Sequence, residues 1–288
     1  MTALYRQATA HFVRRRALAM LVPAACLLAA GLHPVHAAPA AGSHIDTVAG
    51  RRIETLTLAP PDAAVCVVFE NGVRATIDSW SRVTDALAQE PATSLFAYNR
   101  PGIGNSEASA TARDGATVVA ELRQLLDQKG LKPPYILVGH SLGGLYMQLF
   151  ARRYPDEVKG LVLVDAVYPG VVKKPQEFPW LTRSAKWLAF SRSVNAEIDL
   201  AHQSGEQVRA LPAIDHIPIV QLINKPTGKT AVGVDFGAFN QDDQTRALVK
   251  AMYPKATRRV LDSDHQMQVH SAGAVLDAIR EIMALPAR

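Results

Sequence analysis

The stretch of the chain that most constrains its fold is residues 135–144, with the sequence YILVGHSLGG. It begins as an apolar run typical of a buried strand, stops at a Gly-x-Ser-x-Gly pattern, and continues with Leu142, Leu145 and Leu149 at helical spacing. A serine on so sharp a strand-to-helix turn has a strained backbone and an exposed hydroxyl, and the flanking glycines let strand and helix approach closely. The five residues alone also fit a glycine-rich turn with a solvated serine, so the rest of the chain has to decide.

Apolar runs and helical patterns alternate along the rest of the chain. Residues 64–69 are continuously apolar between Pro60-Pro61 and Asn71-Gly72, which indicates a strand buried on both faces. Strands are expected at 51–59, 64–69, 94–98, 135–139, 158–164, 217–223 and 257–261, and helices at 76–89, 111–131, 142–150 and 274–285. This alternation predicts an α/β fold with a mostly parallel central sheet and helices on both faces.

The first 37 residues differ in character from the rest. Residues 1–37 contain four arginines and no acidic residue, include an apolar run over 17–32, and end in VHA, with small residues at the −3 and −1 positions. This pattern indicates a secretory signal peptide, whereas a transmembrane anchor needs a longer run than the one that Pro23 and Gly31 interrupt. We expect an exported protein, periplasmic or secreted, without a stable membrane anchor after cleavage; general and twin-arginine export both stay open.

Loss of that segment changes the charge of the chain. The formal charge of +5 comes from 31 basic and 26 acidic residues, and removal of four arginines leaves 27 against 26, a charge of +1. A nucleic-acid partner is therefore not expected. Cys66 would be the one cysteine left, so no intramolecular disulfide is expected. Residues 38–50 are interpreted as a flexible leader, and residues 51–288 as one large domain.

If Ser141 is a nucleophile, it needs a base to take its proton. His265 follows the last expected strand directly, in the sequence LDSDHQ, at the sheet edge where functional loops of such folds gather. It is the candidate base. The other histidines fit less well. His140 neighbours the serine, but its side chain should point in another direction, and His270 suits a helix-cap or surface position. His202 and His216 fall in or beside a region that breaks the alternation of strands and helices.

A carboxylate is needed to orient the base. The turn at Ser141 is called the elbow below, and the helix that follows it the elbow helix. Asp165 ends the strand after that helix, 24 residues beyond Ser141, and is the favoured candidate. The alternative is an acid after the next strand, where the chain offers Asp235, Asp242 and Asp243. Asp242 and Asp243 also fit as N-caps of a following helix, and Asp165 also fits as a structural residue that binds loop amides.

The oxyanion of an acyl transfer reaction would be held by backbone amides. One donor is the N–H of Leu142, at the positive end of the elbow helix. The second should lie in the loop after the first buried strand, ENGV at 70–73, and Val73 is the candidate. A side chain at Gly72 would obstruct the approach of a substrate carbonyl.

With these residues in place, the chain resembles an α/β-hydrolase of the single-domain esterase/lipase-like type. The resemblance covers residues 53–285 in family order, and its motifs are FENG at 69–72 with Trp80 downstream, YNRPGIGNS at 98–106, LVGHSLGG at 137–144, YPDEV at 154–158 leading to LVLVD at 161–165, and SDH at 263–265. It implies a serine, histidine and acid triad and no cofactor or metal; the chain also lacks a Walker loop, a dinucleotide fingerprint and a metal cluster.

The chain departs from the family pattern at several positions. Many members have histidine in place of Asn71, aspartate in place of Asn99, and glycine in place of Asp264. The acid that members often carry after the penultimate strand is absent from its usual place. Pancreatic-type lipases take their acid from the preceding strand end, so the resemblance favours Asp165.

The alternation breaks between about residues 167 and 215, where such hydrolases insert a cap over the active site. This segment carries Phe178, Trp180, Trp187 and Phe190. These aromatic residues either line an apolar acyl or alcohol pocket or pack the cap onto the core. The sequence does not distinguish the two.

The function that these features predict is hydrolysis of a carboxylic ester of a small-molecule acyl substrate through an acyl-enzyme. A serine nucleophile argues against dehalogenase and epoxide hydrolase chemistry, which in this fold uses an aspartate at the elbow. Two alternatives stay open: acyl transfer or cleavage of a lactone, thioester or amide with the same triad, and a catalytically silent binding protein with this fold. The oligomeric state is also left open.

Overall fold

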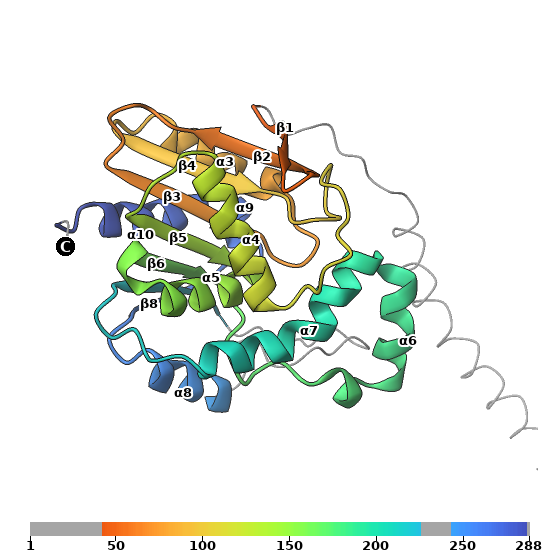
Figure 1. Cartoon of the computed structure of the whole chain (residues 1–288). Helices are drawn as coiled ribbons and strands as arrows, with labels where there is room; N and C mark the ends of the chain where they lie inside the picture. Colours follow the sequence, from red (N-terminus) through yellow and green to blue (C-terminus); the bar gives the residue numbers. More distant parts are fainter. Residues whose placement is uncertain (1–41, 226–242, 287–288) are drawn as a thin grey trace, which may run out of the picture.

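The computed structural model describes residues 42–225 and 243–286, and an eight-stranded sheet lies at the centre of the molecule (Figure 1). The strand order is β1-β2-β4-β3-β5-β6-β7-β8. The pairings of β1 with β2 and of β2 with β4 are antiparallel, and all the others are parallel. The strands are β1 (His44–Val48), β2 (Arg51–Leu58), β3 (Val65–Glu70), β4 (Thr93–Tyr98), β5 (Tyr135–His140), β6 (Val158–Val164), β7 (Ile219–Asn224) and β8 (Thr257–Leu261). The predicted fold class is confirmed.

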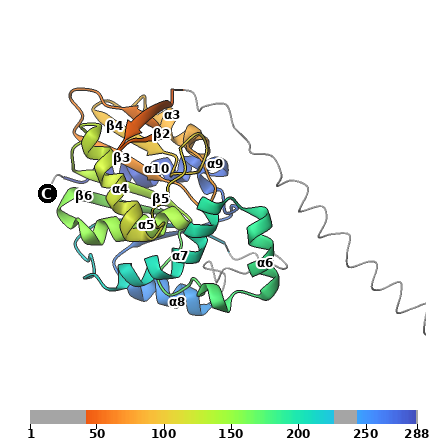
Figure 2. The same ribbon diagram turned by 45° about the vertical axis from the view of Figure 1, so that its right-hand side comes forward.

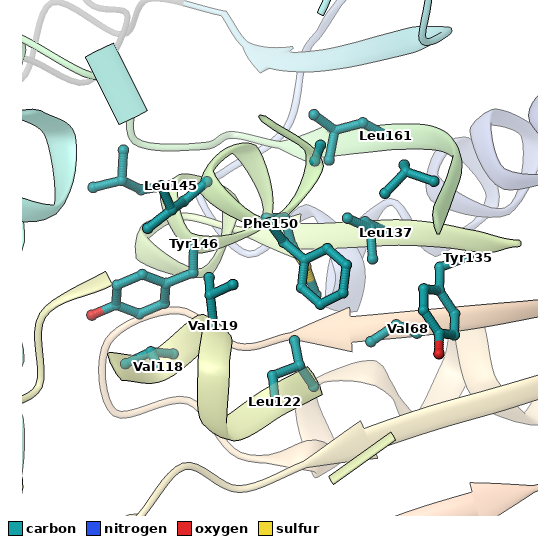
Figure 3. Close-up of a cluster of buried hydrophobic side chains, with 14 of the residues drawn as sticks. Val68, Val118, Val119, Leu122, Tyr135, Leu137, Leu145, Tyr146, Phe150 and Leu161 are labelled. Atoms are coloured by element: carbon teal, nitrogen blue, oxygen red, sulfur yellow. The ribbon is translucent and has the colours of Figure 1, made fainter. Parts of the chain in front are cut away.

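The middle of the sheet is buried on both faces. Every residue of β3, β4 and β5 is buried, as their continuous apolar sequences require. Successive side chains alternate between two cores: Val68 and Leu137 join one, and Val67 and Ile136 join the other. Figure 3 shows part of the first core, where side chains of the strands meet those of helices α4 (Gly115–Gln128) and α5 (Leu142–Arg153).

Helices cover both faces of the sheet. On one face, α4 and α5 are joined by α8 (Asp243–Met252), whose Val249 belongs to the same core. On the other face, η1 (Ile77–Trp80), α3 (Ser81–Leu87), α9 (Met267–His270) and α10 (Ala272–Met283) pack together, with Trp80 and Ile279 fully buried. Because α5 starts directly after β5 and α9 follows β8, the loops at the carboxyl ends of these strands lie at one edge of the sheet.

The element boundaries differ from the prediction in three places. Residues 44–48, predicted to be flexible leader, form β1 and pair with β2, so that part of the leader assignment is wrong. The helix predicted at 76–89 begins as a 3-10 turn before α3 starts. The helix predicted at 111–131 begins only at Gly115, because the carboxylate of Asp114 accepts from the N–H of Ala116 and caps it. The proposed signal peptide, residues 1–37, lies outside the described residues.

Between β6 and β7 the chain leaves the sheet and forms the cap. It contains η3 (Pro175–Glu177), α6 (Trp180–Ala189) and α7 (Arg192–Arg209). Helix α7 packs against α4 and α5, whereas α6 contacts α7 and lies at the periphery (Figures 1 and 2). In residues 42–225 and 243–286, no helix combines the length and apolar character needed to cross a bilayer.

Candidate active site

Ser141 occupies the sharp turn between β5 and α5. Its φ is 51° and its ψ is −121°, a left-handed conformation that a residue with a side chain rarely adopts. A Cβ on Gly139 would lie 2.6 Å from the Cα of Gly144, so only glycine lets the strand and the helix approach this closely. The strained elbow inferred from the sequence is therefore present.

The structure brings Asp165 and His265 together. Asp165 directly follows β6, and its Oδ2 lies 2.7 Å from Nδ1 of His265, which lies in the loop between β8 and α9. The side chain of Asp165 is 3% exposed and that of His265 is 43% exposed. The carboxylate is therefore buried, whereas the imidazole is accessible from solvent. The backbone N–H of Asn224 donates to the other oxygen of Asp165 at 3.3 Å. Because a carboxylate only accepts, the hydrogen lies on Nδ1 of His265 and leaves Nε2 as the acceptor nitrogen.

Of the three alternative acids, Asp243 belongs to the described residues, and it does not occupy this position. Asp243 begins α8, is 99% exposed and pairs with Arg246, in agreement with a role at the start of a helix. Asp235 and Asp242 lie outside the described residues. Asp165 is thus the carboxylate that contacts the candidate base.

His140, which we expected to point away from the site, contacts the candidate base. Its ring is 2% exposed, and its Nε2 lies 2.8 Å from the backbone oxygen of His265. Burial, reinforced by the proximity of His265, lowers the pKa of His140 from 6.5 to about 3. A neutral His140 therefore donates from Nε2 to the His265 carbonyl and holds the loop that carries the base. The sequence does carry a signal for this role of His140, because it is a polar residue at the end of an otherwise apolar strand.

His270, His202 and His216 lie outside this arrangement. His270 ends α9 and is paired with Asp264 at 2.7 Å on the surface, as expected. His202, in α7, has its Nδ1 2.9 Å from the backbone oxygen of Val172 and helps to fix the cap. His216 is exposed in the loop before β7.

The candidate oxyanion loop, residues 70–73, is fixed by a buried arginine. Arg100 donates to the carbonyl of Asn71 at 2.6 Å and to the carbonyl of Gly72 at 2.9 Å. In a trans peptide the C=O and the following N–H point in opposite directions, so this contact directs the N–H of Val73 away from Arg100. A Cβ on Gly72 would lie 2.8 Å from Nδ1 of His140 and 3.2 Å from the Cβ of Ser141, so a side chain there would crowd both residues.

Arg100 is held in turn by two carboxylates, Glu70 at the end of β3 and Glu197 in cap helix α7. The distances are 2.6 Å to Glu70 and 2.7 Å to Glu197, and all three side chains are fully buried. Burial disfavours the charged guanidinium, but Glu197 and Glu70 outweigh it and raise the pKa of Arg100. Burial also raises the pKa of Glu70, and Arg100 partly offsets that effect. Sequence reasoning did not identify this cluster, because Glu197 lies 97 residues from Arg100.

Two positions that depart from the family pattern have structural roles. Asn71 donates to the backbone oxygen of Tyr98 at 2.8 Å and accepts from the indole N–H of Trp80 at 2.8 Å. Asn99 accepts from the N–H of Ile77 at 2.9 Å and donates to Glu54. Both amides thus fasten the loops that surround the elbow.

A cavity of about 290 Å³ opens onto Ser141 and His265. Leu142 and Val73 line it, next to the serine, and Arg74 contributes a cation whose guanidinium lies 5.3 Å from the ring centre of Phe190. The wall is mostly apolar, and the cap contributes six of its apolar residues: Val167, Val172, Phe178, Phe190, Ile198 and Ala201. The two phenylalanines therefore face the site, whereas Trp180 and Trp187 are exposed.

Comparison with known proteins gives a family match. A sequence profile described as the alpha/beta hydrolase fold matches residues 65–213. The uncharacterized protein YqjL of Bacillus subtilis (strain 168) is 34% identical over 103 residues, which are 36% of this chain and 40% of that protein. The (lyso)-N-acylphosphatidylethanolamine lipase of Homo sapiens is 32% identical over 119 residues, 40% of this chain and 34% of that protein. The chain thus spans less than half the length of these relatives.

Among solved structures, Cfl2 from Burkholderia cenocepacia is similar over 83% of this chain and 94% of that chain. The TM-score is 0.64 and the sequence identity 20%. At this identity, the similarity concerns the fold.

Proposed function

Since the chain belongs to the family with the α/β hydrolase fold, we propose that it is a serine hydrolase that cleaves a carboxylic ester through an acyl-enzyme. The observation that carries the proposal is the 2.7 Å contact between Asp165 and His265 beside a serine in the elbow conformation. The cavity lined by Ser141, His265, Leu142 and Val73 supports the proposal, because acyl transfer needs a nucleophile, a base and two backbone donors around one substrate.

The proposed reaction has two halves. In the first, Nε2 of His265 takes the proton of Ser141 as Oγ bonds to the ester carbon, and the N–H groups of Leu142 and Val73 receive the oxyanion. The intermediate collapses, the carbon–oxygen bond to the alcohol breaks, and His265 gives its proton to the leaving alkoxide. In the second half, His265 takes a proton from water, which attacks the acyl-enzyme. Collapse releases the carboxylic acid and returns the proton to Ser141.

The shape of the cavity supports a small apolar substrate. Its volume of about 290 Å³ is at the low end of ligand pockets, which span ~300–1,000 Å³. It is also about twice that of an apolar cavity that holds benzene, ~150 Å³. We therefore propose an ester with a short acyl group, whose hydrocarbon part contacts Phe178, Phe190 and Ile198 of the cap. The human relative is named a lipase, which agrees with ester cleavage.

We also propose that the protein acts after export. Four arginines without an acidic residue, an apolar run and a cleavage-site pattern support a signal peptide over residues 1–37. Detection of the processed chain outside the cytoplasm, beginning at Ala38, would test this part separately.

Active-site labelling tests the enzyme itself. We expect a fluorophosphonate to form one adduct on Ser141 of the folded chain, located by mass spectrometry of peptides. Ser141→Ala should abolish labelling and p-nitrophenyl ester turnover, whereas Ser263→Ala, whose hydroxyl pairs with Ser271, is the matched control and should retain both. Absence of an adduct on the folded protein would contradict the proposal. Product analysis with a competing alcohol separates hydrolysis from acyl transfer.

A further inference from the structure

Helix α6 of the cap carries its apolar side chains on the outside. Trp180 and Trp187 are seven residues apart, almost two full turns, so they lie on one face, and Leu181 and Leu188 lie beside them. Their side chains are 76%, 59%, 48% and 71% exposed, respectively. We call these four residues the α6 face.

The inner side of the same helix is polar. Thr182 and Lys186 are buried, and Lys186 is neutralised by Asp199 of α7 at 2.7 Å. A surface helix of a globular protein normally shows the reverse pattern, with the apolar side toward the core. Exposed apolar residues on such a helix indicate a contact surface, because a contiguous apolar patch is costly in water.

Basic residues flank the α6 face in the sequence. Lys174, Arg183 and Arg192 are exposed, and between residues 174 and 192 they are accompanied by one acidic residue, Glu177. Tryptophan with leucine on one side of a helix and lysine or arginine at its border is the composition of helices that lie in the plane of a bilayer surface. Indole rings prefer the headgroup region, and basic side chains are attracted to anionic lipids.

The segments on both sides of α6 reach the candidate active site. Phe178 precedes the helix and Phe190 follows it, and both line the cavity at Ser141. Figures 1 and 2 show α6 at the edge of the molecule, on the far side of α7 from the sheet. A second cavity, of about 660 Å³, is lined by Trp180, Trp187 and Arg183 together with the Lys186–Asp199 pair, and it offers room for a headgroup.

We propose that the α6 face is a docking surface for bilayers that contain anionic phospholipid. The contact is peripheral and reversible: two indole rings and two leucines enter the headgroup region, and Lys174, Arg183 and Arg192 meet lipid phosphates. Docking in this way holds the cavity at Ser141 close to the membrane surface. The proposal concerns binding alone and is independent of the hydrolytic function.

Tryptophan fluorescence gives a direct test, because the chain has three tryptophans and Trp80 is fully buried. The probe is vesicles of phosphatidylcholine with an equal part of phosphatidylglycerol, mixed with the full chain. We expect the emission of Trp180 and Trp187 to shift to the blue and to be quenched by lipids brominated near the headgroup. Residues 17–32 are apolar but contain no tryptophan, so their contact with lipid would not produce this signal.

Matched variants measured by vesicle co-sedimentation separate the apolar and the charged contributions. Trp180→Ser with Trp187→Ser should weaken binding by at least about tenfold. Ile45→Ser with Val260→Ser, which removes two exposed apolar side chains from strands β1 and β8, should leave it unchanged. Each of Lys174→Gln, Arg183→Gln and Arg192→Gln should weaken binding to the anionic vesicles by roughly fivefold and have little effect on phosphatidylcholine alone.

Three results would overturn the proposal. One is unchanged emission with saturating anionic vesicles, and another is equal co-sedimentation of the wild type and the double tryptophan variant. The third is a dimer in solution that the tryptophan variant dissociates, because the α6 face would then be covered by a second copy of the chain. Both tryptophans are exposed, so loss of binding in a variant with an unchanged circular dichroism spectrum cannot come from unfolding.

Discussion

At the scale of single residues, the candidate site depends on a carboxylate that the sequence favoured over three other acids without excluding them. Asp165 has a φ of 40°, directly after β6, and this turn aims its side chain at His265 across a gap of 100 residues in sequence. Its burial and its bond from the N–H of Asn224 fix the carboxylate before any substrate arrives. An orienting group is effective only when it is held in this way.

We predict that Asp165→Asn lowers kcat for p-nitrophenyl esters by about three to four orders of magnitude with little change in KM. An amide N–H directed at Nδ1 of His265 favours the wrong tautomer, and substitutions of this kind in serine proteases cost ~10⁴ in kcat. Asp243→Asn is the matched control, because the exposed side chain of Asp243 pairs with Arg246 within α8, and its kcat should equal that of the wild type. Equal losses in the two variants would refute the assignment.

His140 gives the protein a measurable sensitivity to acid. Its pKa is about 3 in the folded protein against 6.5 for the unperturbed group, so the unfolded chain binds the extra proton throughout this interval. The free energy of unfolding should therefore fall as the pH is lowered below 6.5, by about 2 kcal/mol at pH 5. Denaturant titrations at a series of pH values measure this slope. His140→Gln should lack that contribution, and an identical slope in both proteins would contradict the prediction.

Ser141 and His265 could be proposed from the sequence because each directly follows an expected strand in a short local pattern. Arg100 and Glu197 could not, because their relation arises only when the cap folds over the end of β4. His140 was misjudged for a related reason. Neighbouring side chains diverge at a regular turn, yet the loop after β8 returns to contact this ring from the other side.

At the scale of secondary structure, continuous apolar runs located the central strands to within one or two residues, because burial on both faces requires such runs. Strand β1 escaped prediction. It is an edge strand whose residues are mostly exposed, and nothing in its five residues separates it from a loop. Its register depends on β2, a partner that local pattern does not reveal.

The contact between cap helix α7 and the loop after β3 leads to a prediction for Glu197. Glu197→Gln keeps the shape of the side chain but removes the negative charge that pairs with Arg100. Arg100 in turn positions the carbonyls of Asn71 and Gly72. We expect kcat to fall about tenfold to a hundredfold, less than the ~10²–10³ lost with a whole oxyanion donor, while KM stays within about twofold. The affinity for a trifluoromethyl ketone, which forms an oxyanion, should fall in parallel.

Asp199→Asn is the control for this prediction, since Asp199 lies on the same helix and pairs with Lys186 of α6. It loosens the cap without contact to Arg100 and should leave the affinity for the ketone unchanged. A purely structural role of Glu197 would make both variants lose stability and neither lose affinity for the oxyanion analogue.

At the scale of the whole molecule, the cap and the sheet share one interior. Ala201 and Val208 of α7 belong to the same core as α4 and α5, and the hydroxyl of Ser204 accepts from the N–H of Gly115 at 2.8 Å. The buried pair of Glu197 with Arg100 adds a connection that is costly to break, because separation leaves a charge without its partner in the interior. Helix α6, by contrast, contacts the rest of the protein mainly through α7.

Native-state hydrogen exchange should therefore divide the cap in two. We expect the protected amides of α7 and of α5 to exchange through openings of the same free energy. The two helices share one core, so an opening of either helix disrupts the packing of both. Amides of α6 should exchange through smaller openings, since that helix buries polar side chains and exposes its apolar ones. Mass spectrometry of peptides from 192–209, 142–153 and 180–189 measures the three values. In Glu197→Gln the value for α7 should fall below that for α5. An α7 that already opens separately in the wild type would instead identify the entire cap as an independent lid.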